Sequence, residues 1–236
     1  MENNTKKDIR ALSLDQLKSV FNDMGEKAFR ANQVYEWIWR KSAISFDEMS
    51  NLSKPLREAL NNHFVINAVK INSSQFSSDR TIKNTFSLHD SHLIEGVLIP
   101  TTERMTACVS SQVGCSLTCK FCATGYMDRK RNLNADEIYD QVVLINKQAI
   151  EKYNLPLTNI VYMGMGEPLL NYANVLKSID RITAEDGLHM ASKRITVSTA
   201  GIAKMIKNAI LPAKPKVRCT MENGLRICYE EGAEGY

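Results

Sequence analysis

Three cysteines with the spacing Cys-x3-Cys-x2-Cys constrain this chain more than any other feature. Cys115, Cys119 and Cys122 lie in one short stretch that begins after Gly114 and ends near Gly125. Thiolates this close in sequence can converge on one metal site, and they favour zinc, copper(I) or iron–sulfur clusters. A four-iron cluster usually takes four cysteines. A loop that supplies three would leave one iron open to a ligand that is not protein.

A structural zinc site is the alternative, because Cys-x2–4-Cys is its usual half-site. The fourth ligand could then come from Cys108 or from a distant residue. The two alternatives differ in function: one is an enzyme with a reactive metal centre, and the other is a zinc-stabilised RNA-binding module without catalysis. A protein purified without oxygen should be brown if it holds iron and sulfide, and colourless if it holds zinc.

The composition places the cysteines in a globular protein. The chain has 236 residues, 44% hydrophobic and 24% charged, which is enough for one substantial core and a small appendage. No apolar run approaches the roughly 20 residues of a membrane span, and the N-terminus is polar, so we expect a cytoplasmic protein without membrane association. Clustered cysteines in a reducing compartment indicate metal ligands or catalytic thiols. The formal net charge of +4 mildly favours an anionic partner.

Residues 1–66 have the pattern of a helical domain. Apolar residues recur with a helical period after Ser13, a plausible N-cap, and a second helix is expected from about Arg30 to Trp39. Basic and aromatic residues are interleaved around this second helix, a pattern that suits phosphate contacts and base stacking. Alternatively, the aromatic residues form the core of a helical bundle and the charges face water. The residues concerned are Lys27, Phe29, Arg30, Tyr35, Trp37, Trp39, Arg40 and Lys41.

The rest of the chain predicts an α/β fold. Residues 67–104 read as antiparallel β-hairpins, and after the cysteine loop strands alternate with helices. This alternation predicts a parallel sheet, open or closed into a barrel, with function at the carboxyl ends of its strands. The expected strands are 70–76, 81–88, 92–99, 105–110, 159–163 and 194–198, and the expected helices are 134–152, 171–183 and 202–208.

Candidate binding residues follow two of these strands. The strand 159–163 leads into Gly164-Met165-Gly166-Glu167-Pro168. Glycines let the backbone approach a ligand closely, and the Glu167 carboxylate can accept a hydrogen bond from an ammonium group, although such a segment can also be a plain turn. Ser198 ends the next strand, where its hydroxyl could bind a ribose or a carboxylate, or cap the following helix.

These segments together resemble the RlmN family, whose members belong to the radical S-adenosylmethionine (SAM) superfamily. Phe121 before Cys122 matches the aromatic residue of the superfamily signature. More specific similarity lies in residues 27–31, 107–115, 163–171 and 195–201. The resemblance covers roughly residues 8–208. It implies a partial (β/α) radical SAM barrel over 105–208, an N-terminal helical RNA-binding domain over 1–66 and a β-hairpin extension over 67–104.

The family resemblance also implies cofactors and partners. It places a 4Fe-4S cluster on Cys115, Cys119 and Cys122, and SAM on Gly166, Glu167 and Ser198. The implied reaction is methylation of carbon 2 of an adenine in 23S rRNA and in tRNA. A flavodoxin-type electron donor would reduce the cluster, and the protein would act as a monomer. The related Cfr family, which methylates carbon 8 instead, shares most of these motifs.

Two further roles rest on the same resemblance. Carbon 2 of adenine is not nucleophilic, so the family uses radical chemistry and carries the methyl group on a cysteine near the C-terminus. Glu95 matches the residue that accepts a proton from the RNA adduct. Cys108 matches a second cysteine, which forms a disulfide with the carrier and releases the product. Alternatively, Glu95 is an exposed strand residue and Cys108 a buried thiol.

The tail, residues 209–236, departs from the family pattern. The family's methyl-bearing cysteine is followed by Gly-Gln-Leu, and neither Cys219 nor Cys228 has these neighbours. We therefore expect a truncated or frameshifted end, with an exposed sheet edge and apolar face. Such a chain would bind the cluster and cleave SAM slowly to 5′-deoxyadenosine without methylating RNA.

Overall fold

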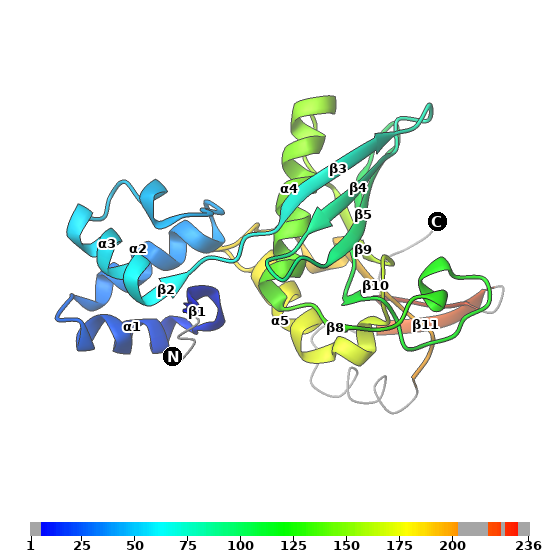
Figure 1. The fold of residues 1–236 in the computed structure, drawn as a ribbon. Helices are drawn as coiled ribbons and strands as arrows, with labels where there is room; N and C mark the ends of the chain where they lie inside the picture. Colours follow the sequence, from blue (N-terminus) through cyan, green and yellow to red (C-terminus); the bar gives the residue numbers. More distant parts are fainter. Residues whose placement is uncertain (1–5, 203–216, 223–224, 231–236) are drawn as a thin grey trace. The chain divides into compact units, whose positions relative to one another are not determined.

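The computed structural model describes residues 6–202, 217–222 and 225–230 (Figure 1). The chain forms two compact units. The first comprises Met1–Ala68 with Ala184–His189, and the second comprises Val69–Thr183 with Met190–Tyr236. None of the described helices has the length and apolar composition of a membrane span.

The first unit is helical, as its sequence predicts. Ser13 caps the first helix with a capping box: its Oγ accepts from the Gln16 N–H at 3.2 Å, and Gln16 Oε1 accepts from the Ser13 N–H at 2.9 Å. Phe21 and Leu60 belong to the buried core. The elements are β1 (Lys7–Asp8), α1 (Leu14–Asp23), α2 (Ala28–Trp39), α3 (Lys54–His63) and β2 (Phe64–Val65), with 3-10 helices at Ile9–Ala11 and Phe46–Glu48. Strands β1 and β2 pair in parallel.

The aromatic residues of α2 divide between core and surface. Trp39 is fully buried and lies against Tyr35, with ring centroids 6.2 Å apart. Trp37 instead lies under the Lys41 ammonium group, 4.0 Å from the ring centroid. Phe29 is 47% exposed, and the Arg30 guanidinium lies 4.8 Å from its ring centroid. The core interpretation therefore holds for Trp39, and RNA contact by the residues at the surface stays a prediction.

The second unit is built on an eight-stranded sheet with the order β11-β12-β10-β9-β6-β5-β4-β3. Its strands are β3 (Lys70–Phe76), β4 (Ile82–Ser87), β5 (Leu93–Pro100), β6 (Met105–Cys108), β9 (Asn159–Tyr162), β10 (Ile195–Thr199), β11 (Val217–Glu222) and β12 (Leu225–Glu230). Strands β6, β9 and β10 are parallel, and the other pairs are antiparallel. The predicted α/β fold with a hairpin extension is confirmed.

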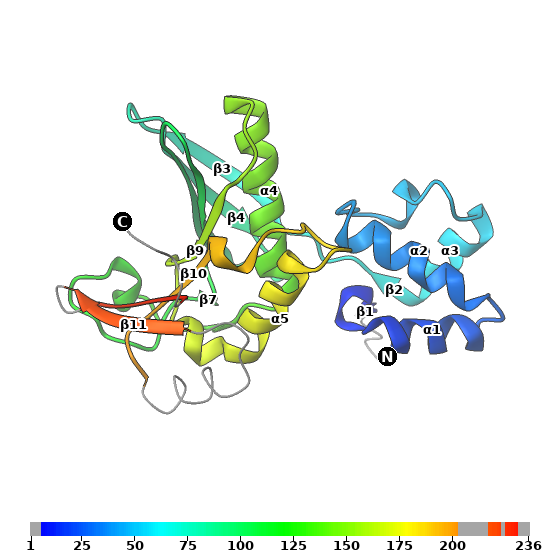
Figure 2. The same ribbon diagram turned by 180° about the vertical axis from the view of Figure 1, so that it is seen from behind.

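Two helices connect the parallel strands. They are α4 (Ala135–Tyr153) and α5 (Tyr172–Thr183), and they lie side by side on one face of the sheet (Figure 2). Buried residues alternate along the strands beneath them, as at Ile94 and Leu98 of β5. The residues between, including Glu95 and Val97, are partly exposed on the opposite face. Within the described residues the sheet is open and does not close into a barrel.

Short elements complete the second unit. Strands β7 (Gln112–Val113) and β8 (Arg131–Asn132) pair with each other at the base of the cysteine loop. The 3-10 helices are Ala123–Tyr126, Pro168–Asn171 and Ser192–Arg194. The predicted helix 202–208 lies outside the described residues beyond its first position.

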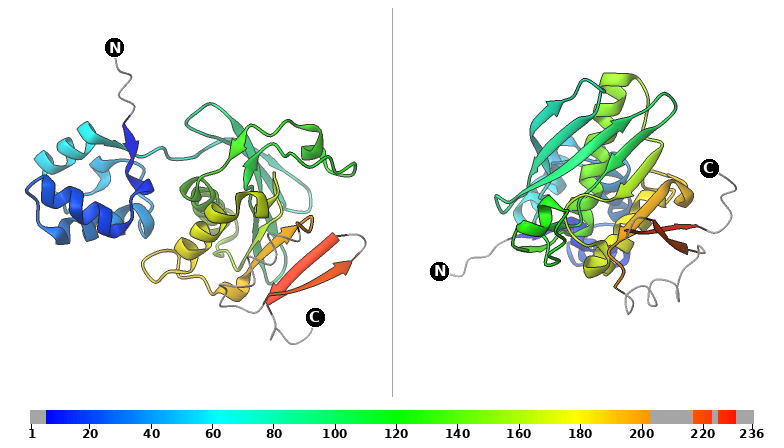
Figure 3. Two further views of the ribbon diagram at one scale, coloured as in Figure 1. Left: turned by 90° about the horizontal axis from the view of Figure 1, so that it is seen from below. Right: turned by 90° about the vertical axis from the view of Figure 1, so that its right-hand side faces the viewer.

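The tail differs from the expectation of an unpaired sheet edge. Strand β12 pairs antiparallel with β10, where Ser198 is opposite Ile227, and β11 pairs with β12 (Figure 3). The expectation was wrong at this edge because the tail supplies a hairpin. Asn223-Gly224, a strong hairpin signal, stands between the two strands in the sequence. Cys219 and Cys228 are opposite each other in the register of this hairpin.

Candidate functional site

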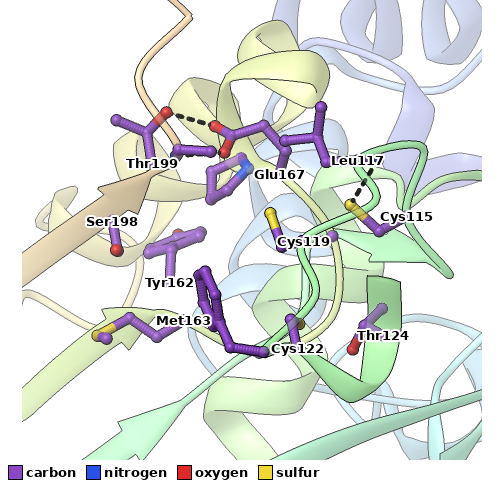
Figure 4. A pocket seen from close by; sticks show the side chains of 15 residues that line it. Cys115, Leu117, Cys119, Cys122, Thr124, Tyr162, Met163, Glu167, Ser198 and Thr199 are labelled. Atoms are coloured by element: carbon purple, nitrogen blue, oxygen red, sulfur yellow. Dashed lines mark hydrogen bonds between the residues drawn. The ribbon is translucent and has the colours of Figure 1, made fainter. Parts of the chain in front are cut away.

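The carboxyl ends of the three parallel strands meet around one cavity of about 300 Å³ (Figure 4). The cysteine loop after β6 forms one side, and the segments after β9 and at the end of β10 form the other. All six residues predicted from sequence to bind a metal or a cofactor line this cavity: Cys115, Cys119, Cys122, Gly166, Glu167 and Ser198. Phe121, which is 79% exposed, lines it as well.

Backbone contacts close the cysteine loop at its base. The Cys115 N–H donates to the Met127 carbonyl at 3.3 Å, and the Lys130 N–H donates to the Val113 carbonyl at 2.8 Å. Gly114 has a φ of +72°, and a Cβ there would lie 2.2 Å from the Asp128 carbonyl oxygen. Only glycine fits this left-handed, crowded position without strain. The loop therefore leaves and re-enters the fold at nearly the same point.

The thiols of the loop suit an iron–sulfur cluster. Cys115, Cys119 and Cys122 are free and partly exposed, and the Leu117 N–H donates to Cys115 Sγ at 3.4 Å. Three soft thiolates facing a cavity, with a backbone N–H directed at one sulfur, are the ligands and the supporting contact that such clusters take. Across the part of the chain that the structure describes, no three His, Cys, Asp or Glu side chains are arranged to hold a single metal ion.

The buried Glu167 carboxylate lies on the opposite side of the cavity. Its Oε1 accepts from the Leu169 N–H at 2.9 Å and from Thr199 Oγ1 at 2.6 Å, and its Oε2 accepts from the Ala200 N–H at 2.7 Å. A carboxylate has about four acceptor positions, so these bonds leave room for about one more donor. An ammonium group entering the cavity would suit that position.

Thr199 is the functional residue that sequence reasoning missed. It follows Ser198 at the end of β10 and joins this strand to the turn after β9 through Glu167. Its hydroxyl oxygen also accepts from the Gly201 N–H at 3.1 Å. The only sequence signal was a second hydroxyl residue beside Ser198, and nothing in the sequence pairs it with a carboxylate 32 positions earlier.

The glycines after β9 pack closely against the segment that precedes the cysteine loop. A Cβ at Gly164 would lie 2.7 Å from the carbonyl carbon of Val109, and one at Gly166 would lie 2.4 Å from Gln112 Cβ. Gly166 also has a φ of +94°. The Glu167 N–H donates to Gln112 Oε1 at 2.9 Å. The turn after β9 is therefore held tightly against the segment that leads into the cysteine loop.

Glu95 and Cys108 lie on adjacent strands, outside the lining of the cavity. Cys108 is opposite Val97 in the register of β5 and β6, so Glu95, two residues from Val97, shares a sheet face with Cys108. Glu95 Oε1 forms an ion pair with Lys83 Nζ at 2.7 Å, a partner not foreseen from sequence. Burial raises the pKa of the Cys108 thiol above its usual range, opposed by a hydrogen bond from the Met163 backbone.

Comparison with known proteins agrees with this geometry. The family model described as the ribosomal RNA large subunit methyltransferase N-terminal domain matches residues 7–66, and that of the radical SAM superfamily matches residues 109–212. The chain is 69% identical over 201 residues to a protein of Cytophaga hutchinsonii named as a probable dual-specificity RNA methyltransferase RlmN. Over these residues the chain is similar to members of the RlmN family.

Other members and a solved structure extend the comparison. A protein of Flavobacterium psychrophilum with the same name is 59% identical over 226 residues, which are 96% of this chain and 64% of that protein. The match to the Cytophaga hutchinsonii protein covers 85% of this chain and 55% of its relative. The chain thus spans 55% to 64% of the length of these two curated relatives. The crystal structure of a radical SAM methyltransferase from Sphaerobacter thermophilus superposes with a TM-score of 0.79 at 37% identity, covering 89% of this chain and 62% of that one.

Proposed function

We propose that this chain carries the cluster-binding and SAM-binding part of an RNA methyltransferase that acts on carbon 2 of adenine in 23S rRNA and tRNA. The observation that carries the proposal is the common cavity, which three thiols share with Glu167 and Ser198. In this proposal residues 1–66 bind RNA, 67–104 form an extension, 105–208 form the radical SAM domain, and 209–236 are an atypical tail. The names of the relatives, which are RNA methyltransferases, support RNA as the substrate.

The cavity residues would divide the work of binding. Cys115, Cys119 and Cys122 would hold a 4Fe-4S cluster. On the opposite side, Glu167 would accept from the ammonium group of SAM at its remaining acceptor position, with Gly166 and Ser198 beside it. When bound, these groups supply radical chemistry, which methylation of a carbon that is not nucleophilic requires. A reduced donor of the flavodoxin type would provide the electron.

Glu95 and Cys108 would act on the open face of the sheet. We assign Glu95 as the proton acceptor, with Lys83 holding its carboxylate in place. Burial raises the pKa of the Cys108 thiol and so keeps it protonated near neutral pH. A protonated thiol is a poor nucleophile, which would restrain disulfide formation until a carrier cysteine is presented.

A matching carrier cysteine is the part of the family mechanism that this sequence lacks. Neither Cys219 nor Cys228 precedes Gly-Gln-Leu. We therefore expect the chain by itself to bind the cluster and to cleave SAM slowly without transferring a methyl group to RNA. We also expect it to act as a monomer in the cytoplasm.

The test is anaerobic reconstitution with iron and sulfide, followed by addition of reductant, SAM and tRNA. 5′-Deoxyadenosine and methyladenine are then measured separately. We expect a brown protein that forms deoxyadenosine and no methyladenine. Stoichiometric methyladenine would contradict the inactivity, and changing Cys219 and Cys228 separately to Ala would then identify the carrier. A methyl group found on carbon 8 would favour the Cfr-like reaction. A colourless protein that contains zinc and binds RNA would contradict the assignment as an enzyme.

A further inference from the structure

Arg131 stands where the cysteine loop rejoins the fold. It is the first residue of β8 and lies opposite Val113, the last residue of β7 before the loop. Every residue from 115 to 132 is partly or fully exposed, and Tyr126 of the loop is 78% exposed. The loop therefore has no buried side chain of its own to set its shape. Apart from the hydrogen bonds within the loop, the contacts that fix its geometry lie at its base.

The Arg131 guanidinium binds two carboxylates from two other elements. Its Nη1 and Nη2 donate to Glu137 Oε2 and Oε1 at 2.7 and 2.8 Å, which is a bidentate pair. Its Nε donates to Asp90 Oδ2 at 2.5 Å. Glu137 lies in the first turn of α4, and Asp90 lies in the turn between β4 and β5. One side chain thus connects the end of the loop to a helix and to the hairpin extension.

Glu137 is a firm anchor for this contact. Its side chain is 1% exposed, and its Oε2 also accepts from the Asn134 N–H at 2.8 Å, which caps α4. His89 Nδ1 lies 3.4 Å from its Oε1. A buried carboxylate that loses its cation is strongly destabilised, so the fold favours the position in which Arg131 reaches it. Neither Glu137 nor Asp90 lines the cavity.

We propose that Arg131 is a positioning residue, whose bonds to Glu137 and Asp90 fix the end of the cysteine loop so that the three thiols keep the spacing a cluster needs. The inference rests on the proposed function, because it concerns the same cysteines. It also gives the β4–β5 turn a role, as the outer support of the loop. The opposite side of the base is supported by Gln112, whose Nε2 donates to Asn132 Oδ1 at 2.8 Å.

Arg131→Gln tests this inference, with Arg129→Gln as the matched control. Arg129 is an exposed arginine of the same loop, and its Nη2 donates to Asn132 Oδ1 at 3.2 Å. Each variant is reconstituted anaerobically and then exposed to an iron chelator. Arg131→Gln should lose iron about tenfold faster or more, because changes to the outer partners of metal ligands typically cost about 10–100-fold in metal affinity. Arg129→Gln should lose iron at the rate of the unchanged protein.

A spectroscopic signal separates positioning from general stability. The electron paramagnetic resonance spectrum of the reduced cluster, with and without SAM, should change in Arg131→Gln. It should be partly restored in Arg131→Lys, which keeps the positive charge but cannot form the bidentate pair with Glu137. Asp90→Asn removes the more exposed contact and serves if Arg131→Gln does not fold. Unchanged iron release and spectra in Arg131→Gln, or in Asp90→Asn if that variant has to stand in, would overturn the inference alone. If the protein without substitutions holds no iron after reconstitution, both the proposed function and this inference are overturned.

Discussion

The cysteine loop and the turn from Gly164 to Pro168 face each other across one cavity, and the fold holds them in different ways. The loop has no buried residue between positions 115 and 132, whereas Glu167 is 4% exposed and accepts three hydrogen bonds. The turn is therefore organised before any ligand arrives. The loop has backbone hydrogen bonds of its own, such as that from the Cys122 N–H to the Cys119 carbonyl at 3.0 Å, but no buried side chain, so we expect binding of a cluster to add to its order, at a cost in conformational freedom.

The largest effect is expected from changes to the cysteine loop. Changing Cys115, Cys119 or Cys122 singly to Ala should abolish iron binding, because a cluster held by three thiolates has no spare protein ligand. Iron content and visible absorption after anaerobic reconstitution measure the loss. Cys108→Ala is the control, since this cysteine lies outside the cavity and should leave iron content unchanged. Full iron retention in any of the three loop variants would contradict the assignment.

Glu167→Gln should weaken SAM binding on the opposite side of the cavity and leave the cysteine loop able to bind iron. The amide keeps the shape of the side chain but loses the charge that an ammonium group would meet. SAM affinity should fall about tenfold or more, since hydrogen bonds to charged groups contribute about 1.5–3 kcal/mol. Iron content should stay unchanged, because Glu167 is no ligand of the cluster. Equilibrium binding of SAM to the reconstituted protein measures the effect, and equal affinities would remove Glu167 from the SAM site.

How far the sequence alone predicts this site can be judged from the same two regions. The spacing of the cysteines is local, and so are the strand that ends before Gly164 and the N-cap at Ser13, so all of them were predicted. The contact of Thr199 with Glu167 spans 32 positions, and that of Arg131 with Asp90 spans 41. Such pairs exist only once the sheet has formed, and local patterns carry no information about them.

The glycines after β9 were expected to let the backbone approach a ligand, and this stays a prediction. The structure shows in addition that Gly166 packs against the side chain of Gln112, which is distant in sequence. The tail was expected to leave a sheet edge unpaired, although Asn223-Gly224 is a hairpin signal in the sequence. The family pattern carries no information about this hairpin, because the tail departs from that pattern.

Thr199→Val sharpens the comparison, because it removes one hydrogen bond to Glu167 and leaves the charge of the carboxylate in place. Valine has the shape of threonine and lacks the hydroxyl that donates to Glu167 Oε1. The stability should fall by about 1 kcal/mol, and SAM affinity should fall on the order of fivefold, the equivalent of one lost hydrogen bond. Thr199→Ser should restore both. Thr196→Val on the same strand is the control, and an equal effect there would show that valine in β10, not the lost bond, is responsible.

The smallest effect on the cavity is expected from the helical unit, which we propose binds RNA. Reversing two charges together, Lys27→Glu with Arg30→Glu, should weaken tRNA binding and leave iron content and SAM affinity unchanged. Arg30 already donates to Gln33 Oε1 at 2.8 Å and lies on the Phe29 ring, so a phosphate would share its guanidinium. Each lost phosphate contact should lower the slope of log affinity against log salt by about 0.7–0.9.

Lys18→Glu with Lys54→Glu is the control, since both lysines lie in the same unit and pair with acidic neighbours. If the Lys27 and Arg30 variant keeps the affinity and salt slope of the unchanged protein, these residues are only a solvated face, and the RNA contact has to lie elsewhere.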